Sequence, residues 1–373
     1  MKDIIVIYYS YKPNTAPINR LLSFLHGFDD YGIEAEMVFL YPDEKANRAD
    51  EFGFNHVHFS YLWKQNRSRN KYYKFLLSFF DVIRFVKRLP KGSKVLLISS
   101  SSYLPFIIWR KDIEVYHERT EHPYVAKTFP HFLQRSYLRA CRKTKGLFVI
   151  STALGKYYQG IGVKNVSIVN MTVDDNRFNG IVKRDAKEHY IAYCGAASNN
   201  KDGVDILIKA FSIVHGQYPD LKLYVLGKAP KEDDETGNLN LVAELGIKDA
   251  VVFKGLVPAE QMPQLLVDAD MLALARPDSL QAQCGFPTKL GEYLLTGNPV
   301  VVTSVGDIPV FLKNGENALI AEPGNVDDFA DKMIWVINHS EEAKRIGLLG
   351  KETALKCFNY RTETKKIIEA MNK

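Results

Sequence analysis

Short apolar runs alternate with helix-like stretches along this chain, and no other feature constrains its fold as strongly. Buried parallel strands are short and rich in β-branched and aromatic residues, whereas helices that pack on a sheet repeat apolar residues three and four positions apart. Such alternation predicts an α/β fold with a doubly wound parallel sheet. In the first half the predicted strands are Ile4–Tyr9, Glu36–Leu40, Val95–Ser99, Ile113–Tyr116 and Leu147–Ile150, and the predicted helices are Pro17–Phe28, Tyr72–Arg88 and Phe132–Arg142.

The alternation begins again after the strand Val166–Val169 and the turn-rich stretch Asn170–Lys187. A chain of 373 residues is also long for one hydrophobic core. We therefore predict two Rossmann-like doubly wound domains facing across a cleft, with ligands at the carboxyl ends of the strands. The predicted elements of the second half are strands Tyr190–Cys194, Lys222–Leu226, Val251–Phe253, Met271–Ala275, Val300–Thr303 and Ala318–Ala321, and helices Gly203–His215, Leu239–Leu245, Ala259–Ala269 and Lys289–Thr296.

Composition and charge exclude several classes of protein. With 46% hydrophobic and 25% charged residues the chain has the composition of a globular protein, and its net charge of +6 is spread too evenly to indicate nucleic-acid binding. The apolar runs Ile4–Tyr9 and Val95–Trp109 are too short or too interrupted for a signal peptide or a membrane span. Four widely spaced cysteines predict free thiols and a cytoplasmic location: Cys141, Cys194, Cys284 and Cys357.

Residues 64–94 form a basic stretch interleaved with aromatic and aliphatic residues. Three interpretations are open: a core helix with a solvated basic face, a helix at a membrane surface, or a nucleic-acid patch. Phe75, Phe79, Val82 and Val86 recur at helical spacing, which favours core packing for that face. The density of lysine and arginine leaves peripheral membrane contact open, and nucleic acid is the weakest of the three.

The segment from Ala275 to Thr303 carries the strongest chemical signal. A predicted strand ends at Ala275, and the next helix opens near Thr288, so the N–H groups of Gly285, Phe286 and Thr288 could point at an anion. Glu292 follows about one turn later, where its carboxylate could accept two hydrogen bonds from a vicinal diol such as ribose. The plain alternative is a capped helix with a solvated glutamate.

The run GFPTKLGEYLLTGNPVV in this segment resembles the donor-binding loop and helix of the family 4 retaining glycosyltransferases, which have the two-domain GT-B fold. The resemblance implies donor binding by Gly285, Phe286, Pro287, Thr288 and Glu292, with Glu292 as the ribose ligand. Family members have a second glutamate eight positions earlier. Here that position holds Cys284, which cannot offer acceptors of comparable strength.

A second run, YCGAASNNKDGVDILIKAF, resembles the opening of the same family's C-terminal domain. Gly195 matches the glycine that lets the backbone approach the donor, and Lys201 matches the lysine that neutralises the diphosphate. The family's arginine position holds Ala196, and we hypothesise that Arg276 compensates for it. Plain alternatives are a surface lysine in a turn for Lys201 and a structural arginine for Arg276.

Two further sets of site residues rest on the resemblance. Gly255, Leu256 and Val257 follow a predicted strand and resemble the loop that passes the nucleobase, although a plain strand-to-helix turn is an equal alternative. In the first half, His117 ends a predicted strand where family members often carry a histidine near the acceptor, and Glu118 stands beside it. We predict His117 and Glu118 as catalytic residues, against the alternative of a structural histidine.

The resemblance covers roughly residues 188–340 well and residues 151–178 in part. It implies transfer of a sugar from a nucleotide diphosphate sugar to a hydroxyl of a glycan or lipid-linked acceptor in cell-surface polysaccharide synthesis, with retention and without a metal or cofactor. Asp233 and Asp234 are predicted to lie solvated in a polar loop. The predicted domains are 1–175 for the acceptor and 176–355 for the donor, with a helix in 356–373 that packs back on the first.

Two alternatives to transfer stay open at this point. One is a nucleotide-sugar epimerase of the same fold, and the other is a catalytically silent homologue that binds a nucleotide sugar. Ala196 and Cys284 are the residues that favour the silent homologue, because each stands where the family carries a charged side chain.

Overall fold

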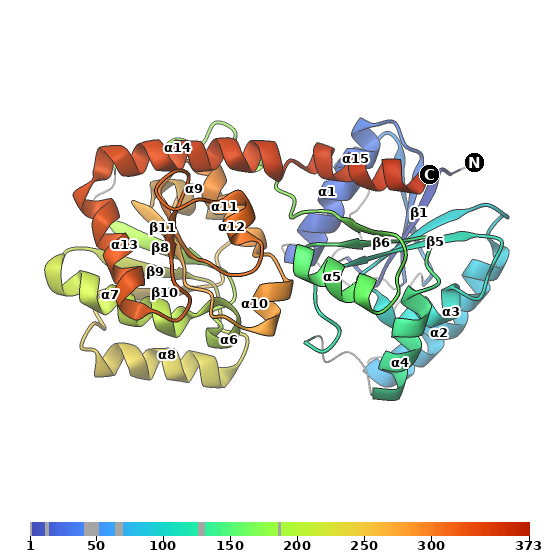
Figure 1. Ribbon diagram of the computed structural model, residues 1–373, viewed down its shortest axis with the longest axis horizontal. Helices are drawn as coiled ribbons and strands as arrows, with labels where there is room; N and C mark the ends of the chain where they lie inside the picture. Colours follow the sequence, from blue (N-terminus) through green and yellow to red (C-terminus); the bar gives the residue numbers. More distant parts are fainter. Residues whose placement is uncertain (1, 12–14, 41–51, 64–69, 126–130, 186–187) are drawn as a thin grey trace. The chain divides into compact units, whose positions relative to one another are not determined.

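The computed structural model describes residues 2–11, 15–40, 52–63, 70–125, 131–185 and 188–373. The chain divides into two compact units, which are described separately. Unit 1 consists of Met1–Thr172 and Tyr360–Lys373, and unit 2 consists of Val173–Asn359. Over the described residues each unit contains one wholly parallel sheet between helices (Figure 1).

Unit 1 contains a seven-stranded sheet over its described residues, in the order β3-β2-β1-β4-β5-β6-β7. The order reverses between β1 and β4, which pair through Ile5 and Val95. Connections on the two sides of such a point leave in opposite directions and open a crevice at the carboxyl ends of the strands. The strands are Ile4–Tyr8 (β1), Ala35–Phe39 (β2), Val57–Tyr61 (β3), Lys94–Ile98 (β4), Glu114–Arg119 (β5), Gly146–Val149 (β6) and Val166–Ile168 (β7).

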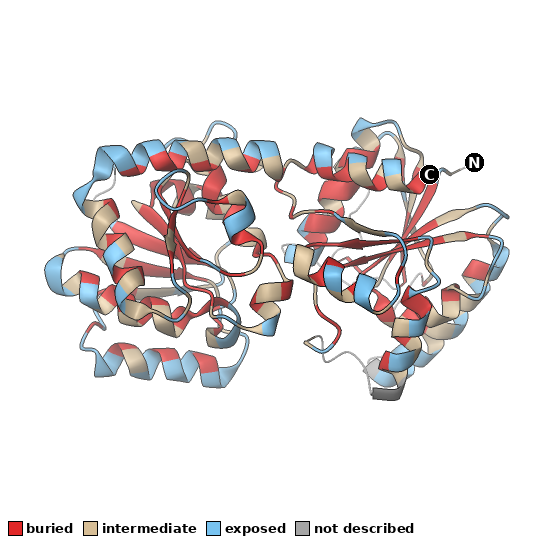
Figure 2. Cartoon of the chain, in the orientation of Figure 1, coloured by how far each residue is buried: buried red, intermediate tan, exposed pale blue. Residues whose placement is uncertain are grey.

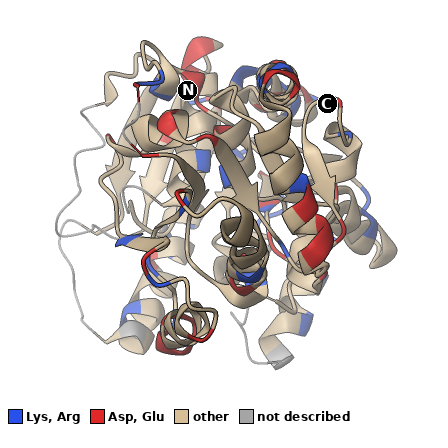
Figure 3. Ribbon diagram, turned by 90° about the vertical axis from the view of Figure 1, so that its left-hand side faces the viewer, with Lys and Arg blue, Asp and Glu red and all other residues tan. Residues whose placement is uncertain are grey.

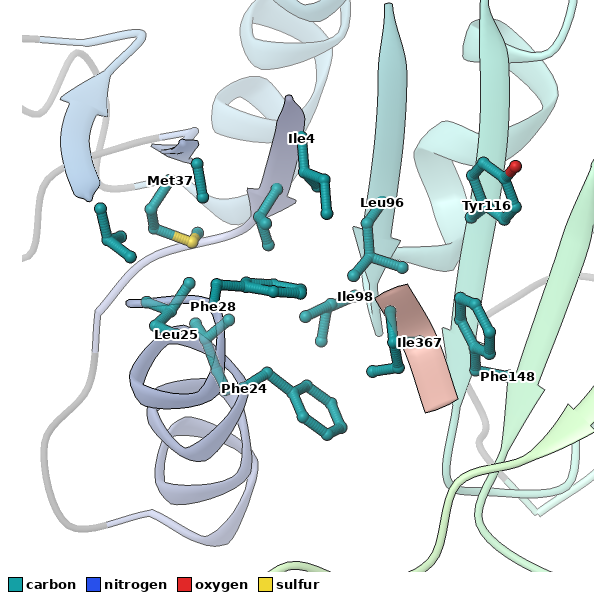
Figure 4. Close-up of a cluster of buried hydrophobic side chains, with 14 of the residues drawn as sticks. Ile4, Phe24, Leu25, Phe28, Met37, Leu96, Ile98, Tyr116, Phe148 and Ile367 are labelled. Atoms are coloured by element: carbon teal, nitrogen blue, oxygen red, sulfur yellow. The ribbon is translucent and has the colours of Figure 1, made fainter. Parts of the chain in front are cut away.

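Helices α1 and α15 lie side by side and cover one face of this sheet (Figure 1). Phe24, Leu25 and Phe28 of α1 meet Ile367 of α15 and the inward side chains of the strands, as Figure 4 shows. The last helix of the chain is therefore part of the core of unit 1. Its helical segments are Ala16–Asp30 (α1), Lys71–Arg88 (α2), the 3-10 turn Ser101–Tyr103 (η2), Leu104–Ile107 (α3), His131–Cys141 (α4), Thr152–Gly160 (α5) and Tyr360–Met371 (α15).

Unit 2 repeats the same plan with a six-stranded sheet over its described residues, in the order β10-β9-β8-β11-β12-β13. Its order reverses between β8 and β11, which pair through Ile191 and Met271. A ligand is expected at the carboxyl ends of these two strands. The strands are Tyr190–Cys194 (β8), Lys222–Leu226 (β9), Val251–Gly255 (β10), Met271–Leu274 (β11), Val300–Thr303 (β12) and Leu319–Ala321 (β13).

The helices of unit 2 include several short ones at the carboxyl ends of the strands. These are the ones that carry the candidate site, whereas α7, α13 and α14 pack on the sheet and on one another. The helical segments are the 3-10 turn Asp175–Phe178 (η3), Asn199–Asp202 (α6), Val204–Gln217 (α7), Glu232–Glu244 (α8), Met262–Asp268 (α9), Leu280–Cys284 (α10), Thr288–Leu295 (α11), Ile308–Phe311 (α12), Val326–Asn338 (α13) and Ser340–Cys357 (α14).

Three expectations of the sequence need correction. Asp233 and Asp234 lie in the first turn of α8 and not in a loop, where their charges favour the positive end of the helix dipole. His117 lies inside β5 and not at its end, because pairing with β4 and β6 continues to Arg119. The edge strand β3 is absent from the predicted strands, since its sequence VHFSY is half polar and half exposed.

Burial follows the two-sided pattern that the sequence indicates. The strands are largely buried, and most helices have one buried and one exposed face (Figure 2). Basic and acidic positions are interspersed along the ribbon, in keeping with the modest net charge (Figure 3). Among the described residues, no helix has the length and apolar character needed to cross a bilayer.

Candidate functional site

The loop that follows β8 brings the backbone into direct contact with a lysine of α11. Gly195 has φ +136°, and a Cβ placed on it would lie 2.2 Å from Lys289 Nζ. A side chain at this position would displace the ammonium group, so the close approach requires glycine. The charge of Lys289 is thereby held against Gly195 and next to Ala196.

Lys289 is also the centre of a buried polar cluster. Its Nζ lies 2.6 Å from Asp202 Oδ2 and 2.9 Å from the hydroxyl of Tyr193, which in turn lies 2.8 Å from the same carboxylate oxygen. Burial lowers the pKa of Lys289, and the charge of Asp202 opposes this effect. Burial alone would raise the pKa of Asp202, but the charge and hydrogen bonds of Lys289 outweigh it, so the net pKa is lowered. Asp202 is therefore charged at neutral pH, and its charge favours the charged form of Lys289.

Arg276 lies just after β11 and is buried beneath the same loop. Its Nε donates to the backbone carbonyl of Lys201 at 3.3 Å, while Nη1 has no hydrogen-bond partner. Burial lowers the pKa of Arg276, although Asp202 favours the charged form. Lys201 itself lies exposed in α6, and its charge acts on Lys289. Three cations and one carboxylate thus converge at the carboxyl ends of β8 and β11.

Two glycines allow the backbone segments around these charged groups to pack closely. Gly203 has φ +67°, and a Cβ placed on it would lie only 1.9 Å from the carbonyl oxygen of Ala275. Gly227, with φ +143°, approaches the carbonyl oxygen of Gly195 in the same way. A larger residue at Gly203 would push the end of α6 away from Ala275, and one at Gly227 would push the end of β9 away from the loop after β8.

Glu292 lies in the second turn of α11 and forms an ion pair with Arg177 of η3. Both side chains are partly exposed, so the carboxylate is held by one partner and still reaches solvent. Burial raises the pKa of Glu292, and Arg177 opposes that rise. The structure therefore adds Arg177 to the surroundings of the predicted ribose ligand.

The loop before α11 differs in one respect from the expected anion-binding loop. The N–H of Gly285 is not free, because α10 continues to Cys284 and Gly285 donates to the carbonyl of Gln281 at 3.0 Å. Pro287 is the residue that precedes the first turn of α11, and Thr288 begins it. The side chain of Phe286 is buried against Phe311 and Phe358, so only its backbone could contact a ligand.

Cys284 is buried, and burial raises the pKa of its thiol, with the charge of Asp307 adding to the effect. The thiol is therefore neutral at physiological pH and carries no charge to a sugar hydroxyl. This environment agrees with a packing role for Cys284.

The predicted nucleobase loop lies at the end of β10. Gly255 adopts φ +63°, and a Cβ on it would meet open space. Leu256 is 82% exposed, which is unusual for a leucine, and Val257 is half-buried. Leu256 follows β10 at the same edge of the sheet as Lys289 and Arg276. An exposed apolar side chain at this edge is suited to contact a flat ring.

In unit 1, His117 and Glu118 are both deeply buried. His117 Nδ1 lies 2.8 Å from the carbonyl oxygen of Leu97, and Nε2 lies 3.1 Å from the hydroxyl of Tyr137 in α4. Burial, aided by the charge of Arg119, lowers the pKa of His117 to about 3, so the ring is neutral. Glu118 points to the opposite face and accepts from Arg20 Nε at 2.8 Å. A direct catalytic role for either residue stays a prediction.

A cavity of about 750 Å³ opens elsewhere in unit 2. It is lined by residues that precede the strands, among them His189, Leu221, Asp270 and Pro299, together with residues of α13 and α14. It therefore lies at the amino ends of the strands. None of the predicted site residues line it.

Comparison with protein families matches residues 188–339 to the family described as Glycosyl transferases group 1. The matched range contains β8, β11, α11 and every predicted donor residue. The matched residues make up most of unit 2, which is thus similar to a group 1 glycosyl transferase domain. This finding confirms the resemblance that the two sequence runs indicate.

Curated relatives match about half of this chain. Mannosylfructose-phosphate synthase of Agrobacterium fabrum is 26% identical over 218 residues, which cover 54% of this chain and 46% of that protein. GDP-mannose-dependent alpha-(1-6)-phosphatidylinositol monomannoside mannosyltransferase of Mycolicibacterium smegmatis is 25% identical over 175 residues, covering 46% of this chain and 45% of that protein. The matches thus span about half the length of each relative.

The fold extends the likeness to the whole chain. The crystal structure of Anabaena Alr3699/HepE in complex with UDP and glucose has a TM-score of 0.79 and 16% identity, and the match covers 100% of both chains. With the seven- and six-stranded parallel sheets, this confirms the predicted GT-B fold of two Rossmann-like domains.

Sequence reasoning missed Lys289, although the residue stands inside the run that resembles the group 1 family. Its role depends on Asp202 and Gly195, which precede it by many residues and meet it only in the folded domain. A lysine three residues before the predicted ribose ligand Glu292 was the available signal, since both lie on the same face of a helix at that spacing.

Proposed function

We propose that this chain is a retaining glycosyltransferase that moves a sugar from a nucleotide diphosphate sugar to an acceptor hydroxyl. The observation that carries the proposal is the convergence of Lys289, which lies against Gly195, with Lys201 and Arg276 at the carboxyl ends of β8 and β11. Against the single carboxylate of Asp202, these cations leave a local excess of positive charge. A leaving nucleoside diphosphate gains negative charge as the glycosidic bond breaks, so this excess favours the transition state.

In this proposal Lys289 supplies the charge that Ala196 lacks. Its ammonium lies against Gly195, the neighbour of the alanine, and the Tyr193 hydroxyl that it contacts lies 2.6 Å from the carbonyl oxygen of Ala196. The cation would thus reach this position from α11. Arg276, with its unpartnered Nη1, is the second source of charge. Cationic side chains in these places remove the need for a metal.

The remaining donor contacts are assigned by the same proposal. Glu292 would accept hydrogen bonds from the ribose diol, with Arg177 holding the carboxylate in place. Leu256 and Val257 would lie along the nucleobase, and the N–H groups around Phe286 and Thr288 would face phosphate oxygens. Alr3699/HepE was crystallised with UDP and glucose, which supports a nucleotide sugar as the class of donor.

The acceptor in this proposal is a hydroxyl of a glycan or a lipid-linked glycan, within cell-surface polysaccharide synthesis at the cytoplasmic face of a membrane. Peripheral contact would involve α2, whose exposed side carries Tyr72, Leu76 and Phe80 beside Arg84. The opposite side, with Val82 and Val86, is buried in unit 1. Lys64, Arg67 and Arg69 of the same basic stretch lie outside the described residues.

The test begins with binding and ends with turnover. Calorimetric titration with UDP, GDP and ADP identifies the preferred base from the three affinities. The preferred nucleotide should also raise the apparent stability of the protein, because it binds the native state. Lys201→Ala, Glu292→Ala and Lys289→Met should each weaken nucleoside diphosphate binding by roughly tenfold or more. Lys248→Ala, an exposed lysine of the same unit, is the matched control and should leave binding unchanged. Unchanged affinity in all three site variants would contradict the site.

Turnover separates transfer from its alternatives. Release of nucleoside diphosphate that depends on an added glycan or lipid-linked acceptor supports transfer, whereas interconversion of the free donor supports an epimerase. Cys284 is the observation that favours a silent homologue, since a neutral buried thiol stands at a position where the family carries a glutamate. Donor binding without turnover over a broad acceptor panel would establish that alternative.

A further inference from the structure

Arg119, the last residue of β5, buries a guanidinium that lacks a carboxylate partner. The residue is 6% exposed. Nη1 donates to Ser101 Oγ at 2.7 Å and Nη2 to the backbone carbonyl of Glu121 at 3.3 Å, while Nε has no hydrogen-bond partner. Among the described residues no ion pair within 4.0 Å includes Arg119. A buried charge is costly unless it is paired, so this position favours an anion that the chain itself does not provide.

Among the described residues, no neighbouring carboxylate contacts the Arg119 guanidinium directly. Glu118 is already engaged by Arg20, whose other nitrogens donate to the carbonyls of Val169 and Asn170. The buried charges along this stretch of β5 are therefore two arginines and one glutamate. His117 is neutral, and the half-buried Glu121 contributes only its backbone carbonyl as a direct contact. The charges of Glu121 and Glu118 act on Arg119 from a distance, so the guanidinium still has no carboxylate of the described chain within hydrogen-bond distance.

Further hydroxyl groups follow two other strands at the same edge of the sheet. Tyr9, just after β1, and Ser102, in the turn after β4, lie 2.7 Å apart and are both half-buried. Burial raises the pKa of Tyr9, and the charge of Arg119 opposes the rise, which places the two groups within electrostatic reach. The turn after β4 includes Ser99 at φ +50°, a left-handed conformation that is rare outside glycine. That turn sets Ser101 on the guanidinium.

The location is where a ligand is expected in this class of fold. Tyr9, Ser101 and Arg119 lie at the carboxyl ends of β1, β4 and β5, and the strand order of unit 1 reverses between β1 and β4. Nε, which is buried and has no hydrogen-bond partner, and Nη2 form one edge of the guanidinium. That edge matches two oxygen atoms of a phosphate or carboxylate in a bidentate contact.

We propose that Arg119, with Ser101, Ser102 and Tyr9, forms a subsite in unit 1 for an anionic group, a phosphate or a carboxylate, on the acceptor. The assignment to the acceptor rests on the proposed transferase function, whereas the anion site itself does not. Recognition by this subsite would select acceptors that carry such a group and would hold them through charge and two parallel hydrogen bonds.

The experiment is a calorimetric titration of the full chain with glucose, glucose 6-phosphate, glucuronate and dioctanoyl phosphatidic acid below its micellar concentration. The sugar phosphate and the soluble lipid distinguish a free metabolite from a lipid headgroup as the source of the anion. The variants are Arg119→Gln, which removes the charge, and Arg119→Lys, which keeps the charge but cannot make the bidentate contact. Arg139→Gln, an exposed arginine of the same unit, is the control.

We expect at least one anionic ligand to bind about tenfold or more tightly than glucose, and Arg119→Gln to remove that preference. Arg119→Lys should keep part of it, and Arg139→Gln all of it. The subsite is overturned if the wild-type protein binds no anion better than glucose, or if Arg119→Gln keeps the preference for an anion. If Arg119→Gln does not fold, the wild-type comparison alone tests the subsite. Because no turnover is measured, Arg119-dependent binding without nucleoside diphosphate binding would contradict the transferase proposal alone.

Discussion

Lys289 Nζ and Asp202 Oδ2 lie 2.6 Å apart and form a mostly buried ion pair that joins α11 to α6. The pair connects two segments that are 87 positions apart in the sequence. Tyr193 contributes its hydroxyl to both partners and so fixes their geometry. The position of the lysine, and with it the charge beside Gly195, therefore depends on Asp202.

Asp202→Asn should destabilise the protein because it leaves the ammonium of Lys289 buried without its counter-charge. Loss of one partner of a buried pair costs about 3 kcal/mol, measured here as a fall in the free energy of unfolding in urea. Asp331→Asn, at an exposed position of α13, should change that free energy by less than about 0.5 kcal/mol. Equal effects of the two substitutions would show that the pair contributes no stability.

Burial of His117 predicts an acid-sensitive unit 1. Its pKa is lowered to about 3 by burial and by Arg119, so the unfolded chain takes up a proton first as the pH falls below about 6.5. The folded state is then disfavoured by about 1.4 kcal/mol for each pH unit between these two values. Stability from this residue is therefore full above pH 6.5 and is lost toward pH 3.

The check is urea unfolding of wild-type protein and His117→Gln between pH 8 and pH 4. We expect the free energy of unfolding of the variant to fall less steeply below pH 6.5. Between pH 7.5 and pH 8 the histidine is neutral in both states, so the two slopes should agree there. Parallel curves over the whole range would contradict a buried neutral imidazole.

Gly203→Ala should be more damaging than a glycine substitution of similar backbone conformation elsewhere. A Cβ at Gly203 would lie 1.9 Å from the carbonyl oxygen of Ala275, whereas a Cβ at Gly180, with φ +74°, would meet open space. Both variants lose about 1 kcal/mol from the left-handed conformation. Only Gly203→Ala must also move backbone, so its midpoint in urea should be clearly lower. Equal urea midpoints of the two variants would mean that the backbone around Gly203 moves without loss of stability.

Most of the fold could be predicted from the sequence because strands buried on both faces are continuous apolar runs. Tyr190–Cys194, Lys222–Leu226 and Val300–Thr303 match the predicted strands residue for residue. The strand β3 could not be found in this way. It is a half-exposed edge strand, and its sequence VHFSY is not a continuous apolar run. Helix α8 begins seven residues before the predicted Leu239, at Glu232, because its first turn is polar and gives no apolar period.

The candidate site was less accessible to sequence reasoning, for a physical reason. Gly195, Lys201 and Glu292 stand in runs that resemble the group 1 family, so local sequence was enough to select them. The partners Asp202 and Arg177, by contrast, are defined by contacts between distant segments. The unpaired state of Arg119 is likewise a property of burial and of what Glu118 already binds, and no local pattern reports it.

The two faces of α2 lead to a prediction about membranes. Core packing explains Val82 and Val86, which are fully buried, but Tyr72, Leu76 and Phe80 recur four positions apart on the solvent side. An exposed apolar stripe of this kind, flanked by Arg84, Lys87 and Arg88, suits the interface of an anionic bilayer. Binding would combine burial of the apolar groups with attraction to the lipid headgroups.

Replacement of both Leu76 and Phe80 by serine should therefore reduce co-sedimentation with phosphatidylglycerol-containing vesicles by about tenfold or more. Leu348→Ser is the matched control, because Leu348 in unit 2 and Phe80 are each 59% exposed. Raising the salt concentration should weaken the residual binding of the double variant further, since only the basic side chains then remain to hold it. Vesicle binding that is equal in wild-type protein and the double variant would assign the stripe to another role.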